Sequence, residues 1–370
     1  MSDSTDQKVM YSCPPEGVVG WRSPSNIALI KYWGKQPRRE QLPANPSLSF
    51  TLHHAYTDMW LYWTRRTHRD DPIELQLYFE GRPADDFRKR IYDFMLRLLP
   101  EMPFLGEYAI TIRTRNSFPH SAGIASSASA MSALALCLVE WKYRCHGLSF
   151  DLHQQYREVS DIARRASGSA CRSIVPQVAL WGAHPDVDEA SDSYAIPLPK
   201  TYRDFAEQWR DLILIVDKSP KSISSSQGHA LMEGHPYATT RYQQAIKHLS
   251  VLLKAMKDND IETFGRIVEA EALTLHALMM CSPTPYLLLK PQTIDVINAI
   301  QNWRRTRDLP MYFTLDAGPN VHLLYPQAYE AEIWTFIATA LPSFYYHPSR
   351  YLADEVGNGP HPLEPTMPDS

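Results

Sequence analysis

This sequence has no long apolar run and no marked excess of charge of either sign. Its most apolar stretch, residues 124–141, is interrupted by four serines and Glu140, so a membrane span is not expected. Lys and Arg number 37 against 41 Asp and Glu, and the net charge of −4 predicts no basic surface for nucleic acid. The polar N-terminus MSDSTDQKVM lacks the apolar segment of a secretory signal, and we expect a cytosolic protein.

Cysteine is also scarce. The five cysteines are widely spaced and form no CxxC pair, which argues against a disulfide framework or a zinc knuckle: they are Cys13, Cys137, Cys145, Cys171 and Cys281. We therefore expect free thiols, mostly buried, in a reducing compartment. Glycine is low at 15 residues while proline reaches 29, which predicts stiff loops. Apolar residues make up 44% of the chain, enough for a sizeable core.

The hydrophobic pattern predicts an α+β protein with a sheet-rich first half and a helix-rich second half. Strands, the first three in an antiparallel sheet, are expected over 50–63, 74–79, 109–114, 212–216 and 311–315. Helices are expected over 87–98, 123–143, 152–166, 239–257, 260–280, 291–306 and 327–340. Residues 1–20 are expected to be a loose lead-in and the Pro- and Gly-rich residues 346–370 a loose tail.

A candidate phosphate-binding turn precedes one of these helices. Residues 117–130 read SFPHSAGIASSASA, so a Pro turn leads through small side chains into an amphipathic helix. Such a start lets an anion approach the free N–H groups and the positive end of the helix dipole. Ser126 and Ser127 add hydroxyl donors, and Ser127 is a possible metal ligand. The pattern alone leaves an equally good alternative, a serine-rich start of a tightly packed helix.

Five segments, taken together, resemble a known family. In chain order they are NIALIKYWGK (26–35), LPANPSLS (42–49), PHSAGIASSA (119–128), IARRASGSACRS (162–173) and DAGPN (316–320). The third resembles the phosphate loop of the GHMP small-molecule kinases. All five, in this order, resemble the motifs of one branch of that superfamily, the diphosphomevalonate decarboxylases.

The resemblance implies a GHMP kinase-like fold with two lobes and a cleft between them. The sheet-rich N-terminal lobe would have a left-handed βαβ, ribosomal-protein-like topology, and the C-terminal lobe would be rich in helices. The corresponding domains would be 21–205, which carries the ATP phosphate loop, and 206–345, flanked by the lead-in and the tail.

The resemblance also implies an activity. The family converts 5-diphosphomevalonate and ATP to isopentenyl diphosphate, ADP, phosphate and CO2, by phosphorylation of the 3-hydroxyl and loss of phosphate and CO2, in isoprenoid biosynthesis. The partners would be a phosphorylated mevalonate and ATP, with Mg2+ entering together with ATP, and the protein would be a homodimer.

Three residues are implied as catalytic. Asp316 would be the base, or the group that orients the C3 hydroxyl. Lys31 would stabilise developing charge and keep Asp316 ionised. Arg172 would hold the substrate carboxylate, because a guanidinium matches a carboxylate with two parallel hydrogen bonds.

Further contacts follow from the same motifs. The implied substrate contacts are Ala28, Tyr32, Ser167, Ser169 and Arg172. The implied ATP phosphate contacts are Pro119, Ser121, Ala122, Gly123, Ile124, Ala125, Ser126, Ser127, Lys221 and Ser225. The last two fall in residues 218–228, which resemble a K-x-x-x-S-[ST]-x-G-M segment and could close over the site. Lys35 is either a second phosphate partner or a solvated lysine, and the pair His53–His54 is expected to be strand surface.

Two departures leave the substrate open. Pro176-Gln177 stand near the point where the family usually has a glycine pair, and Ser226 stands where many bacterial members have Arg. The alternatives are therefore a phosphomevalonate decarboxylase or a mevalonate 3-kinase of the same family. An alternative of another class is a nucleotide-binding regulatory homologue without turnover.

Overall fold

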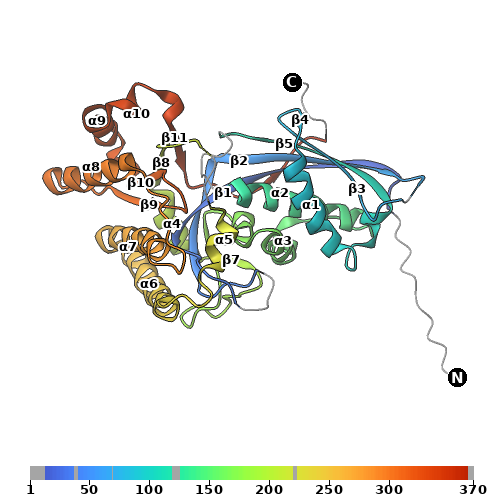
Figure 1. Cartoon of the computed structure of the whole chain (residues 1–370), viewed down its shortest axis with the longest axis horizontal. Helices are drawn as coiled ribbons and strands as arrows, with labels where there is room; N and C mark the ends of the chain where they lie inside the picture. Colours follow the sequence, from blue (N-terminus) through green and yellow to red (C-terminus); the bar gives the residue numbers. More distant parts are fainter. Residues whose placement is uncertain (1–12, 37–40, 69, 119–125, 220–222, 366–370) are drawn as a thin grey trace.

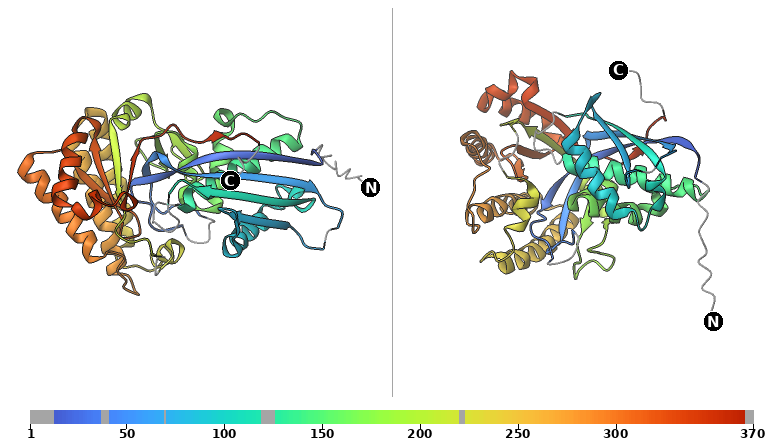
Figure 2. Two further views of the ribbon diagram at one scale, coloured as in Figure 1. Left: turned by 90° about the horizontal axis from the view of Figure 1, so that it is seen from above. Right: turned by 45° about the vertical axis from the view of Figure 1, so that its right-hand side comes forward.

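The computed structural model describes residues 13–36, 41–68, 70–118, 126–219 and 223–365. The strands in these residues form an eight-stranded sheet and a four-stranded sheet. Figure 1 shows the larger sheet in one half of an elongated molecule and the smaller sheet, flanked by helices, in the other half. The two views of Figure 2 agree with this arrangement, so the fold has the two lobes that the sequence predicted.

The larger sheet is built around two long antiparallel strands, β1 (Glu16–Ile30) and β2 (Ser47–Arg65). The strand order is β12-β1-β2-β5-β3-β4, and β6 pairs with β2 and β7. The other strands are β3 (Glu74–Phe79), β4 (Arg82–Pro83), β5 (Tyr108–Asn116), β6 (Val178–Trp181), β7 (Ala195–Pro197) and β12 (His361–Pro362).

One pairing corrects the prediction of a fully antiparallel sheet. β3 runs parallel to β5, because helix α1 (Asp85–Leu98) crosses over between them. A parallel pair needs such a crossover, whereas antiparallel neighbours can be joined by a short turn.

Helix α2 (Ser126–Cys145) is the central helix of this lobe. The sequence predicted one apolar face, but residues 128–139 are all buried. Two serine hydroxyls on it bond to the sheet: Ser129 lies 2.7 Å from the Thr57 hydroxyl, and Ser132 lies 2.6 Å from the Ser23 hydroxyl. These buried bonds set the height of the helix on the sheet, and with it the position of its N-terminal end.

The smaller sheet has the order β11-β8-β10-β9, and all its pairs are antiparallel. Its strands are β8 (Trp209–Leu214), β9 (Tyr312–Leu315), β10 (Val321–Pro326) and β11 (Tyr351–Glu355). Besides α1 and α2, the α-helices of the described residues are α3 (Leu152–Ala166), α4 (Lys200–Glu207), α5 (Ser225–Ala230), α6 (Ala238–Asp258), α7 (Ile261–Met280), α8 (Pro291–Arg307), α9 (Glu330–Ala340) and α10 (Pro342–Tyr345). The long helices predicted from periodicity are confirmed within a few residues.

Both chain ends differ from the loose segments that were predicted. β1 begins at Glu16, inside the expected lead-in. In the tail, β11 pairs with β8 of the smaller sheet and β12 pairs with β1 of the larger sheet. Between them the Gly357 N–H donates to the Thr51 carbonyl at 2.8 Å. The polar composition of the tail suggested disorder, but its backbone groups complete two sheet edges and join the lobes.

The cysteine prediction was also wrong in part. Cys13, just before β1, forms a disulfide with Cys145 at the end of α2, a pairing that a separation of 132 residues hid from the sequence. Cys137 and Cys171 are free and buried, as expected, and Cys281 is free and exposed.

Among the helices of the described residues, none combines the length and apolar character that a membrane crossing requires.

Candidate active site

Two residues 285 positions apart in the chain form the centre of the candidate site. The Lys31 ammonium lies 3.1 Å from the Asp316 Oδ1 and donates to the Ala28 carbonyl at 2.6 Å. Lys31 follows β1 and is 2% exposed, whereas the Asp316 side chain, which follows β9, is 24% exposed. Burial lowers the pKa of Lys31, and the Asp316 carboxylate opposes that shift. A buried ammonium therefore faces a carboxylate that can reach solvent or ligand.

A buried ion pair holds the backbone of Lys31 from behind. The Lys31 N–H donates to Glu271 Oε2 at 2.9 Å, and its carbonyl accepts from Arg241 at 3.0 Å. Glu271 and Arg241, on α7 and α6, bond to each other at 2.5 and 2.7 Å, and His248 Nδ1 lies 2.6 Å from Glu271. Burial alone would raise the pKa of Glu271, but Arg241, His248 and the Lys31 N–H outweigh it and set this pKa at about 2. This pair was not predicted, because Arg241 and Glu271 lie on two different helices outside the matched motifs.

Arg172 is buried, and no carboxylate of the described residues pairs with it. It lies in a 3-10 helix, η2 (Gly168–Ile174), and is 3% exposed. Its guanidinium donates to Asn26 Oδ1 at 3.0 and 3.2 Å and to Ser47 Oγ at 2.8 Å, and the described residues form no ion pair with it. Burial lowers its pKa, while Cys171, Asp316 and Tyr32 act in the opposite direction.

The partners of Arg172 were missed as functional residues, although Asn26 and Ser47 both lie inside the matched motifs. Asn26 Nδ2 donates to Ser173 Oγ at 2.8 Å, which leaves its carbonyl oxygen turned toward the guanidinium. Asn26 and Ser47 are both neutral, so they do not compensate the positive charge that Arg172 places next to Lys31 and Asp316. An anionic ligand would neutralise this charge.

Tyr32 presents a second unsatisfied group. Its ring packs against Trp181, with centroids 4.6 Å apart, and its buried hydroxyl has no hydrogen-bond partner in the described residues. A Cβ added at Gly168 would lie 2.9 Å from this hydroxyl, so glycine is required there for close approach. Ser167 and Ser169, beside Gly168, are half-buried. Buried polar atoms without partners are rare in folded proteins, and ligand binding is one explanation for them.

Only some of the residues predicted to contact ATP lie in the described part of the chain. Ser126 and Ser127 are half-buried at the start of α2. The predicted contacts Pro119, Ser121, Ala122, Gly123, Ile124, Ala125 and Lys221 lie outside the described residues. Ser225 is the first residue of α5. The helix start fits a phosphate group, because its first residues carry partly exposed hydroxyls and helix N–H groups face the same end.

His229, on α5, was not predicted at all. Its ring lies 4.2 Å from the Tyr32 ring and 4.6 Å from the Trp33 ring, measured between centroids. Its Nδ1 accepts from the Gly34 N–H at 3.0 Å. Burial, together with the charges of Lys35 and Arg172, lowers the pKa of His229 to about 3. α5 therefore lies against the Tyr32–Lys35 segment, and Lys35, which is half-buried, lies near enough to act on this imidazole.

The departure at Pro176-Gln177 has a structural counterpart. Gln177 adopts a φ of +57°, in the left-handed region that favours glycine. Its N–H donates to the Gly357 carbonyl at 2.9 Å, and its carbonyl accepts from the Thr51 N–H at 2.9 Å. Its side chain donates to Glu207 at 2.6 Å. The tail and strand β2 thus hold Gln177 in a backbone shape that a glycine would adopt without strain.

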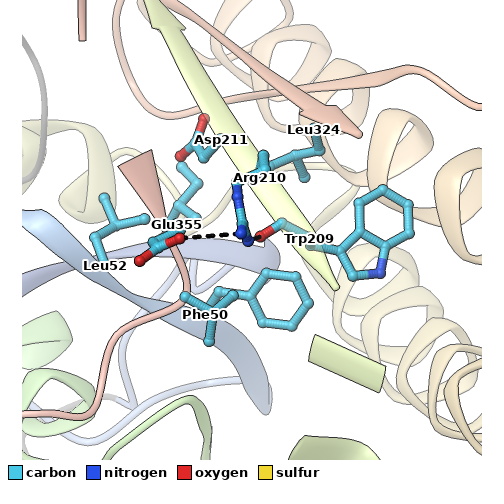
Figure 3. A pocket seen from close by; sticks show the side chains of 9 residues that line it. Phe50, Leu52, Trp209, Arg210, Asp211, Leu324 and Glu355 are labelled. Carbon is cyan, nitrogen blue, oxygen red and sulfur yellow. Dashed lines mark hydrogen bonds and ion pairs between the residues drawn. The ribbon is translucent and has the colours of Figure 1, made fainter. Parts of the chain in front are cut away.

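A small hollow between the sheets, with no measurable room for a water-sized ligand, is separate from these residues. Figure 3 shows Phe50, Leu52 and Trp209 on its walls and the ion pair between Arg210 and Glu355 across it. Because its lining contains none of Lys31, Arg172 and Asp316, we interpret it as a packing gap at the junction of the lobes.

One group of metal-ligand type is present in the described residues, away from the predicted contacts. His53, His54 and Glu355 bring one potential ligand atom each within 4.8 Å of one another. The sequence did not indicate this group, because Glu355 lies some 300 positions from the two histidines. Glu355 is also paired with Arg210 at 3.2 Å.

Two family models together match most of the chain. The model described as diphosphomevalonate decarboxylase-like N-terminal domain matches residues 23–195. The model described as mevalonate 5-diphosphate decarboxylase C-terminal domain matches residues 211–360. A diphosphomevalonate decarboxylase of Ganoderma lucidum is 30% identical over 352 residues, which cover 86% of this chain and 81% of that protein. Its counterpart in Saccharomyces cerevisiae is 29% identical over 336 residues, or 85% and 79% of the two chains.

Solved structures give the same family. A structure of MDDEF in complex with MVAPP, AMPPCP and magnesium has a TM-score of 0.80 and 27% identity, and the match covers 94% of this chain and 99% of that one. The mevalonate diphosphate decarboxylase from Staphylococcus aureus also has a TM-score of 0.80, with 26% identity and coverage of 94% and 98%.

Proposed function

We propose that this chain, which belongs to the diphosphomevalonate decarboxylase family, catalyses the ATP-dependent decarboxylation of 5-diphosphomevalonate to isopentenyl diphosphate. The observation that carries the proposal is the buried guanidinium of Arg172, which has only neutral partners in the described residues. A carboxylate on the substrate would supply the missing negative charge. A regulatory protein that only binds nucleotide has no use for such a group beside the Lys31–Asp316 pair.

The first step transfers a phosphoryl group to a tertiary alcohol. The Asp316 carboxylate orients the C3 hydroxyl and accepts its proton as the oxygen attacks the γ-phosphorus of ATP, and ADP leaves with the bonding electrons. Lys31, 3.1 Å from Asp316, keeps that carboxylate ionised and stabilises the charge on the transferred group. Phosphoryl transfer needs mainly positioning and electrostatic stabilisation, and rigidly held side chains supply both.

The second step breaks two bonds of the phosphorylated intermediate. The C3–O bond breaks with its electron pair on the departing phosphate, and the bond between the methylene carbon and the carboxylate supplies the electrons of the new double bond. CO2 leaves. Arg172 holds the carboxylate in place until the leaving group has departed, with its own position set by Asn26 and Ser47. The unpartnered Tyr32 hydroxyl and the serines 167 and 169 complete the substrate contacts.

ATP and Mg2+ are the proposed co-substrate and cofactor. Ser126 and Ser127, at the start of α2, would contact the phosphates, and Ser127 is the side chain we propose to reach the metal ion. When bound there, Mg2+ would reduce the negative charge on the phosphates of ATP. The related structure that holds MVAPP, AMPPCP and magnesium supports this assignment by similarity. We further propose a cytosolic homodimer.

An assay of ADP, phosphate and CO2 tests the proposal with mevalonate, its 5-phosphate and its 5-diphosphate as separate substrates. We expect the three products in equal amounts, with the highest kcat/KM for the diphosphate, and we expect Asp316→Ala to abolish all three. CO2 release from the monophosphate alone, or ADP formation without CO2, would contradict the proposed reaction. Asp316→Ala turnover at the parent rate would contradict the proposed base.

A further inference from the structure

We propose that His229 is a substrate-binding residue of this chain, whose neutral imidazole donates a hydrogen bond from Nε2 to an anionic oxygen of the substrate diphosphate. The inference rests on the proposed function and adds a specificity-determining contact to it. It concerns a residue that the matched motif does not supply: the K-x-x-x-S-[ST]-x-G-M pattern ends in Met, and His229 stands at that position.

The position of His229 is set by close packing. A Cβ added at the preceding Gly228 would lie 2.5 Å from the Trp33 ring and 2.8 Å from the Tyr286 hydroxyl. α5 is therefore pressed against the Tyr32–Lys35 segment, and its next residue packs its ring on Tyr32 and Trp33. Both aromatic residues belong to the motif that also carries Lys31.

The hydrogen bond from Gly34 determines which nitrogen of His229 carries the proton. The Gly34 N–H donates to Nδ1 at 3.0 Å, so Nδ1 is the acceptor and the neutral ring carries its hydrogen on Nε2. Within the described residues, Nε2 has no hydrogen-bond partner. The ring is thus oriented on one side by the protein, and its other side offers a donor.

The charges around the ring define what this donor can bind. Burial lowers the pKa of His229 to about 3, and the positive charges of Lys35 and Arg172 act in the same direction. The imidazole is therefore neutral at physiological pH and lies in a positive field made by two side chains of the candidate site. A positive field with an available N–H suits an anionic oxygen and disfavours a cation.

The substrate carries two anionic ends, and the carboxylate is assigned to Arg172. The diphosphate is then the group left for His229 and Lys35. Ser226, three residues before His229 on the same short helix, α5, carries no charge. A neutral donor at residue 229 would add a hydrogen bond to the diphosphate from this helix.

Two single substitutions separate the proposed donor at Nε2 from the acceptor at Nδ1 that holds Gly34. In His229→Asn the amide oxygen can accept from Gly34 in place of Nδ1, but no atom reaches the position of Nε2. In His229→Gln the amide nitrogen can reach that position, but the acceptor for Gly34 is lost. His229→Met, the residue of the motif pattern, provides a third variant that keeps the apolar packing and has neither group.

The measurements are KM for 5-diphosphomevalonate, KM for ATP, kcat, and the Kd of 5-diphosphomevalonate by calorimetry without ATP. We expect Asn and Met to raise the KM and Kd of the diphosphate about tenfold or more, with KM for ATP unchanged. We expect Gln to stay within about threefold of the parent. Thermal unfolding of each variant identifies any that fails to fold, and the remaining two then decide.

Three results would overturn the inference. Parent-like Kd in both Asn and Met would show that Nε2 binds nothing. A weakened Gln variant beside a parent-like Asn variant would show that His229 only supports Gly34. A parent enzyme that does not turn over 5-diphosphomevalonate at all would remove the proposed function and this inference together, whereas an active parent with unaffected variants removes the inference alone.

Discussion

Arg172 and Arg241 are both almost fully buried, with 3% and 2% exposure, yet their surroundings differ. Arg241 makes two hydrogen bonds to the carboxylate of Glu271. Arg172 bonds to an amide oxygen and a hydroxyl, and the described residues offer it no carboxylate. Both lie next to Lys31, one behind its backbone and the other within electrostatic reach of its ammonium.

The difference separates a structural charge from a functional one. A buried cation is costly unless a partner compensates it. The charges of Arg241 and Glu271 compensate each other within the protein, although the buried Arg241 Nε has no hydrogen-bond partner in the described residues, and the pair holds the Lys31 backbone in place. Arg172 is left incomplete, and the free energy that its burial costs is recovered only when an anion binds. The substitutions below are designed to test whether the two arginines differ in this way.

The largest expected effect is on stability, at the completed pair. Arg241→Gln leaves the Glu271 carboxylate buried without its main partner, so we expect the free energy of unfolding to fall by about 3–5 kcal/mol. Urea unfolding followed by circular dichroism measures it. A loss of less than about 1 kcal/mol would mean that the pair contributes little to the stability of the fold.

The matched change at the other arginine should act on catalysis. Arg172→Gln keeps hydrogen-bonding ability toward Asn26 and Ser47 but removes the charge that the substrate carboxylate needs. We expect kcat/KM for 5-diphosphomevalonate to fall about 10²- to 10³-fold, while the free energy of unfolding stays the same or rises. A variant that is strongly destabilised and retains parent-like kcat/KM would reverse our assignment of the two arginines.

The completed pair also predicts acid sensitivity. The pKa of Glu271 is about 2 in the folded protein and close to its ordinary value of 4.5 when unfolded. Because the folded pKa is the lower one, this stabilisation is present above pH 4.5 and is lost as the pH falls toward 2. It amounts to the order of 3 kcal/mol. Unfolding curves from pH 6 to pH 2 should show the decline in the parent and a smaller one in Glu271→Gln. Equal slopes would contradict the assignment.

The smallest expected effect comes from replacing both partners of the pair. In the double variant Arg241→Met with Glu271→Leu, neither charge of the pair is left buried, so we expect the free energy of unfolding to recover to within about 1–2 kcal/mol of the parent. Because the two bonds to the Lys31 backbone are lost, kcat should still fall severalfold. A double variant as unstable as Arg241→Gln would show that the hydrogen bonds to Lys31, rather than the uncompensated charge, account for the stability.

The sequence predicted well those elements whose pattern is local. The β-prone runs in β2 and β3, the alternation in β5 and the apolar periodicity of α6, α7 and α8 predicted bounds within a few residues of those observed. β1 was missed because Gly17, Gly20 and Pro24 weaken its strand pattern. In the fold, backbone pairing with β2 along nearly its whole length stabilises this strand despite those residues. The tail was misjudged for the same reason, since its strands are stabilised by distant partners rather than by their own composition.

The candidate site could be predicted only where a motif carried it. Lys31, Arg172 and Asp316 were linked by family resemblance, because nothing local relates residues 141 and 144 positions apart. The Arg241–Glu271 pair lies outside the motifs that were used, and His229 replaces the Met that ends one of them, so neither was indicated by a motif match. Their roles arise from contacts across helices α5, α6 and α7, which the sequence does not reveal.

The most direct test of the central claim compares two ligands on one substitution. 5-Diphosphomevalonate carries the carboxylate that Arg172 is proposed to bind, whereas the product isopentenyl diphosphate lacks it. Calorimetry should show that Arg172→Gln weakens the binding of 5-diphosphomevalonate at least tenfold and leaves the Kd of isopentenyl diphosphate within about twofold. Equal weakening of both ligands, or of neither, would contradict the claim that this buried guanidinium is completed by the substrate carboxylate.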